Sequence, residues 1–220
     1  MQSAPALVGL GVAWGGTALL AGPAVRIIAR SQLTRGVLAQ VVLWGLFAAV
    51  LGIVLQWEKQ PLGSFWLRPL EWQSIAWGCV WSLVSVIVVF PATEWVRKAA
   101  GLAGYAKGME TALACPIWLR VIAVITAGVV EETLFRGFAV TRLLMLTGSL
   151  LAAVCLSSVV FAALHVPVWG VGPSLAFLLG GLATTVFFVW RKDLLAMILA
   201  HVFIDAWGLI VAPLTSRWWD

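Results

Sequence analysis

The sequence predicts an all-α fold, a polytopic membrane helix bundle of about seven transmembrane helices. The 220-residue chain is 62% hydrophobic and only 10% charged. Soluble domains carry about 25% charged residues, so these few charges cannot build a polar shell. The apolar residues also gather into runs close to the ~20 residues that a membrane span needs. Because backbone groups in lipid must be hydrogen-bonded within the chain, each run is expected to be a helix.

The runs follow one another along one chain without an internal repeat. The predicted spans are, in order, Pro5–Ile28, Gly36–Trp57, Ser74–Ala92, Ile117–Val130, Gly148–Val166, Pro173–Trp190 and Leu194–Val211. The fourth run continues through two glutamates to Phe138. The first run lacks a charged leading region and an evident cleavage site, so we expect a retained span rather than a signal peptide.

The connections carry turn and charge signals. QPLGSFWLRPLEW joins spans two and three, and RKAAGLAGYAKGME, between spans three and four, is polar enough for a surface helix or loop. RGFAVTRLLMLTG is predicted as an amphipathic stretch leading into span five. We predict a single membrane domain over residues 1–220, with accessory N-terminal spans in 1–112 and a motif-bearing core in 113–214.

The basic residues sit mostly between the apolar runs, and the net charge is +5. This pattern is typical of loops at a lipid surface, so membrane lipids are expected partners. No basic block is interleaved with aromatic residues in a polar context, and no nucleic-acid partner is expected. The distribution slightly favours an external N-terminus and a cytoplasmic C-terminus. Interfacial anchoring is predicted for tryptophans at run ends, among them Trp57, Trp66, Trp72, Trp190, Trp218 and Trp219.

A small set of ionisable residues lies inside the predicted spans, where such groups are costly and usually functional. They are Glu131, Glu132, Arg136, His165, His201 and Asp205, and they include both histidines of the chain. Glu132 and Arg136 are four residues apart, so they can pair on one helix face. Glu131 is turned about 100° away and has no partner on its own turn. One glutamate is therefore predicted to be structural, and the other free to act as a general base or acid.

The two histidines have neighbours at the same spacing. In FAALH, Phe161 precedes His165 by four residues and can pack beneath the imidazole. In HVFID, Asp205 follows His201 by four residues and can fix its tautomer. A structural Glu132–Arg136 pair and a structural His165 are each plausible alone, but three such elements on three helices favour one shared polar site.

Several functions fit such a site. A carboxylate and two imidazoles can supply a base for water and donors for an oxyanion, as peptide hydrolysis requires. Zinc is an alternative with Glu131, His165 and His201 as ligands, although HExxH is absent. A proton or ion path through the same residues is a third reading, for which matching halves of the chain would be expected. No Ser-His-Asp or Cys-His arrangement is evident.

The ordered motifs resemble those of the CPBP intramembrane proteases. EETLFR fits EExxxR, FAALH fits FxxxH, and HVFID fits Hxxx followed by Asn or Asp. That family includes the CAAX prenyl endopeptidases and the bacterial bacteriocin-processing or abortive-infection (ABI) proteins. The resemblance covers roughly Ile117 to Val211 and not the three N-terminal spans.

The resemblance implies a glutamate-dependent peptidase without a metal cofactor. Glu131 would be the catalytic base, and His165 would help to hold and polarise the attacking water. His201 with Asp205 would stabilise the oxyanion, while Glu132, Arg136 and Phe161 would brace the site or touch substrate. The implied substrate is a membrane-associated or lipidated peptide or lipoprotein.

Asp205 departs from the pattern of the prenyl endopeptidases, which have asparagine there. Ionised aspartate cannot donate a hydrogen bond to an oxyanion, but it can orient a protonated His201 that does. Aspartate occurs among bacterial members, so a bacterial-type subgroup in the cytoplasmic membrane is implied. A non-catalytic immunity or scaffold protein that retains the motif site is the alternative, and the oligomeric state is left open.

Overall fold

The computed structural model describes residues 3–214, and within them every regular element is a helix. Six helices are long and apolar enough to cross a membrane, or up to seven if a bent pair counts as one span. The predicted all-α bundle of about seven spans is confirmed. The six are Ser3–Ile28 (α1, Ser3–Leu10; η1, Gly11–Ala24; α2, Val25–Ile28), Gln32–Trp57 (α3, Gln32–Gly52; η2, Ile53–Trp57), Trp72–Ala99 (α4, Trp72–Val84; η4, Ser85–Val89; α5, Phe90–Ala99), Leu150–Trp169 (α9), Val171–Arg191 (α10) and Leu194–Leu214 (α11, Leu194–Ala206; η6, Trp207–Val211; η7, Ala212–Leu214).

The bent pair carries the EETLFR motif. It joins α6 (Ala106–Leu113) to one long helix, Ile117–Thr147, at an angle of 119°. The long helix contains α7 (Ile117–Thr126), the π-wound η5 (Ala127–Val140) and α8 (Thr141–Thr147). Similar π-wound stretches occur in the N-terminal helices, so this winding does not single out the motif.

The long helix differs from the sequence prediction at its C-terminal end. RGFAVTRLLMLTG was predicted to lead into span five, but it completes span four. The stretch holds no proline, and its leucines, arginines and methionine favour a helix. The helix ends at Gly148, whose φ of +64° suits glycine, and Ser149 begins α9 by accepting a hydrogen bond from the Ala152 amide at 3.2 Å. Span five itself continues past Pro167 to Trp169.

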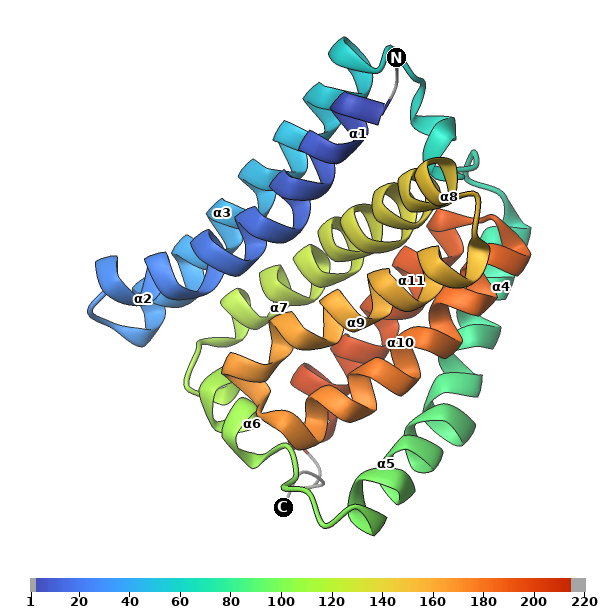
Figure 1. The fold of residues 1–220 in the computed structure, drawn as a ribbon. Helices are drawn as coiled ribbons and strands as arrows, with labels where there is room; N and C mark the ends of the chain where they lie inside the picture. The colour runs from blue at the N-terminus through green and yellow to red at the C-terminus, as the bar shows by residue number, and fades with distance from the viewer. Residues whose placement is uncertain (1–2, 215–220) are drawn as a thin grey trace.

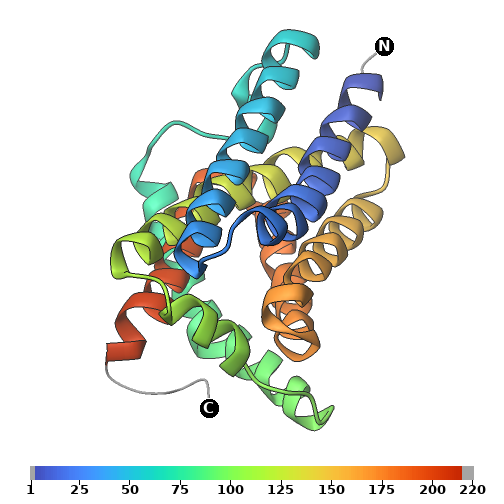
Figure 2. The ribbon, with the colours of Figure 1, turned by 90° about the vertical axis from the view of Figure 1, so that its left-hand side faces the viewer.

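The first two long helices form a hairpin laid against one face of the bundle, and its α2 end leans outward (Figures 1 and 2). Near its other end the hairpin shares the core. Leu10 and Val54 are buried in one cluster with Leu134 and Phe138 of η5. A Cβ on Gly9 would overlap the Phe138 ring, so this glycine permits the close approach of the hairpin to η5.

A buried ion pair ties the same end of the hairpin to α8. Arg142 donates to both carboxylate oxygens of Glu58, at 3.4 Å and 3.0 Å from Nε, and also to the Ser64 carbonyl at 3.2 Å. Ser64 belongs to the short 3₁₀ helix η3 (Leu62–Phe65) that follows the hairpin. Glu58 and Arg142 are both buried. Because both charges are paired and hydrogen-bonded, they can be kept away from water.

Helix α11 is held on two sides by glycines of its neighbours. A Cβ on Gly78 of α4 would lie 3.1 Å from the Ala196 carbonyl oxygen, and one on Gly128 of η5 would lie 3.1 Å from that of Ile198. The start of α11 is fixed by buried Asp193, which accepts from the Ala196 amide at 3.1 Å and from the Ser74 hydroxyl at 2.7 Å. The helix that carries HVFID therefore has a closely defined position.

The tryptophans at run ends divide into two groups. Trp57, Trp72 and Trp190 are exposed, as an interfacial anchor requires. Trp66 instead packs against Phe188, with ring centroids 5.0 Å apart, and belongs to the edge of the core. Trp218 and Trp219 lie outside the described residues.

Candidate functional site

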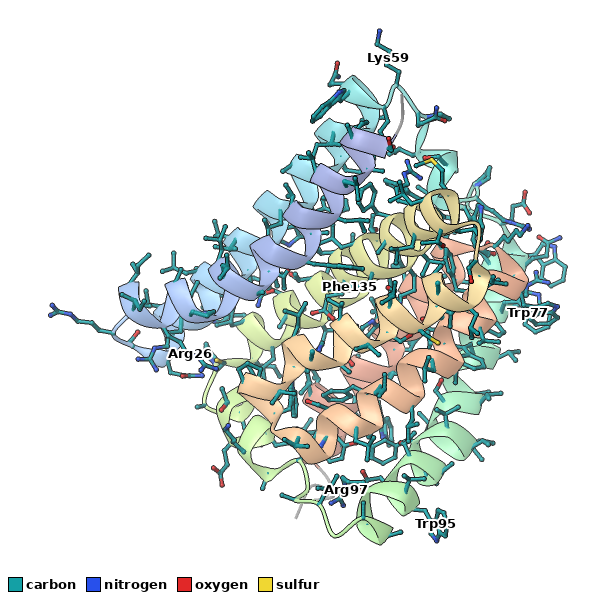
Figure 3. All side chains as sticks on the ribbon, in the orientation of Figure 1. Arg26, Lys59, Trp77, Trp95, Arg97 and Phe135 are labelled. Carbon is teal, nitrogen blue, oxygen red and sulfur yellow. The ribbon has the colours of Figure 1, made fainter. Side chains whose placement is uncertain are left out.

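One cavity of about 1310 Å³ opens between the hairpin and the rest of the bundle. The structure brings all the sequence-predicted site residues to its wall. They come from three helices: Glu131, Glu132 and Arg136 from η5, Phe161 and His165 from α9, and His201 and Asp205 from α11. Figure 3 shows Phe135, which also lines the cavity, near the centre of the molecule, where η5 lies between the hairpin and the remaining helices.

Glu132 is the hub of the polar contacts. Its Oε1 accepts a hydrogen bond from Arg136 Nη1 at 3.0 Å, which confirms the predicted pair. The same oxygen lies 2.7 Å from His201 Nδ1, across the interface between η5 and α11. Its Oε2 is buried and has no hydrogen-bond partner within the described residues. Since a buried carboxylate oxygen without a partner is costly, Oε2 is suited to accept from a water or a substrate group.

His201 is held between two carboxylates. Its Nδ1 faces Glu132, and its Nε2 lies 3.5 Å from Asp205 Oδ2. A carboxylate can only accept, so Nδ1 carries a proton toward Glu132. The predicted His201–Asp205 pair is present, but 3.5 Å is long for a hydrogen bond. Nε2 is thus the ring nitrogen that is less firmly engaged and available to a bound substrate.

His165 is fixed by its own helix and by two phenylalanines. Its Nδ1 lies 2.7 Å from the Phe161 carbonyl oxygen, which can only accept, so in the neutral form of the ring the proton is on Nδ1. The ring packs on Phe161, with centroids 4.5 Å apart, and on Phe177 of α10 at 5.0 Å. Nε2 has no hydrogen-bond partner within residues 3–214 and is left as an acceptor.

Arg136 is shared between the glutamate and the aromatic cluster. Its guanidinium carbon lies 4.2 Å from the centre of the Phe161 ring, close enough for a cation–π interaction. The side chain is only 3% exposed. Arg136 therefore connects the Glu132–His201 group to the Phe161–His165 group, and it orients both.

Glu131 lies apart from this network. It is half-buried in the cavity wall, and in the described part of the chain its carboxylate forms no hydrogen bond or ion pair. His165, His201, Asp205 and Arg136 line the same cavity. This is the arrangement that the sequence predicted, with one glutamate braced and the other free.

The zinc alternative would need the two histidines and a carboxylate to converge on one point. Nδ1 of His201 faces Glu132, and its Nε2 lies 3.5 Å from Asp205 Oδ2. Over residues 3–214, no three His, Cys, Asp or Glu side chains are arranged to hold a metal ion.

Sequence reasoning missed several residues of the site. The contact between Glu132 and His201 joins different helices, and the i,i+4 rule finds only pairs within one helix. Phe177 stands in an ordinary apolar run and gives no signal in the sequence. The hairpin contributes Arg26, Arg35 and Gln40 to the cavity wall, although the N-terminal spans carry no motif.

The comparisons with known proteins agree with the motifs. Residues 113–207, less than half of the chain, match the sequence model of the family described as Rce1-like, type II CAAX prenyl endopeptidase Rce1-like. No curated protein and no solved structure gives a match. The resemblance predicted from EETLFR, FAALH and HVFID is confirmed over this segment.

The class of protein follows from the fold and this match together. Six or seven helices of membrane-spanning length and an Rce1-like segment identify an integral membrane protein. In general terms they support a CAAX-type intramembrane protease.

Proposed function

We propose that this protein is a glutamate-dependent intramembrane endopeptidase that cleaves a membrane-associated or lipidated substrate, with Glu131 as general base. The observation that carries the proposal is the contrast between the two glutamates. Glu132 is braced by Arg136 and His201, whereas Glu131 faces the same cavity with its carboxylate free. An unpaired carboxylate is the group that can accept a proton from water.

In the proposed reaction, Glu131 removes a proton from a water that is also held by His165 Nε2. The resulting hydroxide attacks the carbonyl carbon of the scissile peptide, and the carbonyl oxygen becomes an oxyanion. Collapse of this intermediate breaks the C–N bond, and Glu131 returns the proton to the leaving amine. Phe161 and Phe177 hold the His165 ring in place, so the water position is set before substrate binds.

His201 is the proposed oxyanion donor. Glu132 fixes the ring through Nδ1, and because the contact between Nε2 and Asp205 is long, Nε2–H can donate to the developing charge instead. Donors that are oriented in advance stabilise an oxyanion most in a site that excludes water. Asp205 orients the protonated ring and supplies the resting partner of Nε2.

The cavity suits a substrate with an apolar attachment. Beyond the polar group its wall includes Leu43, Val86, Val89 and Phe177, and it is larger than a drug-sized ligand site of roughly 300–1,000 Å³. The Asp205 variant of the third motif supports the bacterial-type CPBP/ABI subgroup and a bacterial cytoplasmic membrane as the location. Membrane lipids and a peptide or lipoprotein substrate are the proposed partners.

The decisive experiment compares wild type with Glu131→Gln in lipid nanodiscs, using a peptide library from membrane extracts. Glu131→Gln keeps the shape and removes the base, so we expect cleavage to fall by about 100-fold or more with no change in unfolding temperature. Glu110→Gln is the matched control, because Glu110 is an exposed glutamate of α6 outside the cavity wall.

A chelator provides the second arm. We expect cleavage to continue with chelator present, since the carboxylate needs no metal in this mechanism. Undiminished cleavage by Glu131→Gln would refute the assignment of the base. Loss of cleavage with chelator would indicate that Glu131, His165 and His201 hold a metal ion. Binding of peptides by wild type without any cleavage would favour the immunity or scaffold function.

A further inference from the structure

Two cations converge on a single carbonyl where the cavity opens. Arg26 Nη2 donates to the Pro167 carbonyl oxygen at 3.2 Å, and Lys107 Nζ donates to the same oxygen at 3.3 Å. Arg26 ends the first hairpin helix, Lys107 belongs to α6, and Pro167 lies in the last turn of α9. Three elements distant in sequence therefore meet at this point, and Figure 3 shows Arg26 at the outward-leaning end of the hairpin.

Helix geometry accounts for the two hydrogen bonds but not for two like charges at one point. Carbonyls in the last turn of a helix have no intrahelical partner, and each oxygen has two lone pairs, so the Pro167 oxygen can accept from both side chains. The two cations lie no farther apart than the two hydrogen-bond lengths combined, so their charges repel. Among residues 3–214, neither Arg26 nor Lys107 forms an ion pair.

The acid nearest to Lys107 in the sequence, Glu110 of α6, is exposed and lies outside the cavity wall. Arg35 is a third exposed cation in the cavity wall, and its Nε donates to the Ala29 carbonyl in the hairpin turn. The acidic side chains in the described wall are Glu131, Glu132 and Asp205, which lie on η5 and α11 and are engaged in or directed at the polar site. An anion placed between Arg26 and Lys107 would turn their repulsion into two attractions.

The neighbouring residues indicate what carries that anion. Ile27 and Ile28, directly after Arg26, are 85% and 71% exposed. Exposed apolar side chains beside cations at the end of a span are suited to the acyl chains and headgroups of the membrane interface. A phosphate diester also has several acceptor oxygens, so it can receive the planar Arg26 fork and the Lys107 ammonium together.

We infer that Arg26 and Lys107 form a binding subsite for the phosphate of an anionic phospholipid at the opening of the cavity. The headgroup would join the hairpin to α6 and α9, which meet at the Pro167 carbonyl. This subsite is independent of the peptidase chemistry, because none of its residues belongs to the Glu131–His165–His201 group.

The test measures lipid binding to the purified full chain in detergent by native mass spectrometry. The probes are dioctanoyl phosphatidylglycerol and dioctanoyl phosphatidylcholine, which share acyl chains and differ in net charge. We expect wild type to prefer phosphatidylglycerol, and the double variant Arg26→Gln/Lys107→Gln to bind it about 25-fold more weakly, about fivefold for each cation. Arg26→Lys/Lys107→Arg should retain the preference.

A matched control removes the same charge from elsewhere. Arg30 and Lys98 are exposed cations that do not line the cavity, so Arg30→Gln/Lys98→Gln should bind phosphatidylglycerol like wild type. An equal loss in this control would reduce the effect to general surface charge and overturn the subsite. Unchanged lipid binding by Arg26→Gln/Lys107→Gln would also overturn it.

A different outcome would indicate that Arg26 and Lys107 bind the peptide substrate rather than a lipid. In that case Arg26→Gln/Lys107→Gln would bind the lipid normally but show a higher KM for a peptide with a free C-terminal carboxylate than for its amide. Since lipid binding needs no turnover, failure of the proposed peptidase activity and failure of this subsite can be told apart.

Discussion

At the scale of single residues, the site depends on how Glu132 divides its two oxygens. One oxygen serves Arg136 and His201 together, and the other is buried without a partner within the described residues. Breaking a buried ion pair by removing one partner costs more than removing both, because a charge is left uncompensated. Arg136 should therefore be more sensitive to replacement than its distance from the proposed reacting atoms suggests.

The first prediction concerns Arg136→Met. It leaves the buried Glu132 carboxylate with His201 as its remaining partner, so we expect the free energy of unfolding to fall by roughly 3–5 kcal/mol. Glu132→Gln/Arg136→Met removes both charges and should recover part of this loss. The measurement is unfolding in mixed micelles with increasing SDS. A double variant as unstable as the sum of its single variants would show that the two residues act separately.

The second prediction separates the two nitrogens of His165. Asparagine at this position can still donate to the Phe161 carbonyl, as Nδ1 does, but it offers nothing in place of Nε2. His165→Asn should keep the unfolding midpoint and lose about 100-fold or more in kcat/KM. Turnover near that of wild type would mean that Nε2 does not hold the water.

Residue-scale prediction from the sequence succeeded where partners share a helix. Glu132 with Arg136, Phe161 with His165 and His201 with Asp205 were all predicted from a spacing of four, and all are in contact. The bond between Glu132 and His201 could not be predicted in this way. It depends on the rotation of η5 against α11, which is set by packing between whole helices.

At the scale of elements, glycines determine how closely η5 and α4 pack against α11, and this packing limits the rotation of η5 against α11. Gly128 lets η5 approach the α11 backbone, and Gly78 lets α4 approach it from the other side. Close backbone approach through small residues is a main source of helix association in membranes. The sequence showed many glycines, but not which of them face another helix, because glycine leaves no polarity signal.

The third prediction tests this contact with Gly128→Ala. The added Cβ would overlap the Val202 side chain and lie 3.1 Å from the Ile198 carbonyl oxygen. We expect a loss of about 1–3 kcal/mol in unfolding free energy from overpacking, together with reduced cleavage as Glu132 and His201 separate.

Two further variants make the Gly128 result specific. Gly128→Ala/Val202→Ala removes the overlapping methyl group and should restore part of both properties. Gly45→Ala in α3 is the control, since a Cβ there meets no atom within 4 Å and alanine favours a helix. If Gly128→Ala unfolded like Gly45→Ala, the close approach would not matter for stability.

At the scale of the whole molecule, the charged residues define two ends. Arg26 lies at one end of the hairpin and Lys59 at the opposite end (Figure 3). Lys107 shares the Pro167 carbonyl with Arg26, and Arg30 follows in the turn between α2 and α3. Arg68 contacts the Lys192 carbonyl between α10 and α11. Helix α10 has 21 residues, which corresponds to about 31 Å and matches a hydrocarbon core of about 30 Å. The two groups of charges therefore fit opposite membrane surfaces.

The fourth prediction uses this separation. In a variant with Cys79, Cys115 and Cys155 replaced by alanine, a new cysteine at Arg30 and another at Arg68 should react with a membrane-impermeant maleimide from opposite sides of intact vesicles. The excess of basic residues predicts that the Arg30 side is cytoplasmic. Labelling of both positions from one side would contradict a transmembrane orientation of these helices.

The overall architecture could be predicted from the sequence because a chain surrounded by lipid can form few kinds of backbone structure. Apolar runs must become helices, so the number of spans and most boundaries followed from composition. The long helix through Thr147 and the outward lean of the hairpin were not predicted. Both depend on where helix ends meet glycine or side-chain caps and on contacts between distant segments, and neither leaves a periodic pattern in the sequence.

The ion pair between Glu58 and Arg142 limits whether the N-terminal spans of this chain can be replaced by those of another protein. Arg142 belongs to the Rce1-like segment, whereas Glu58 and Ser64 lie outside it. A fragment starting at residue 113 would keep the buried Arg142 guanidinium but lack the Glu58 carboxylate that pairs with it. The Phe138 ring would also lose its contact with the helix that carries Gly9. Such a fragment should accumulate only when residues 1–112 are co-expressed as a separate polypeptide. Grafting foreign N-terminal spans onto this segment would therefore require an acid at the position of Glu58, because this one buried charge connects the N-terminal spans to the segment that matches the family.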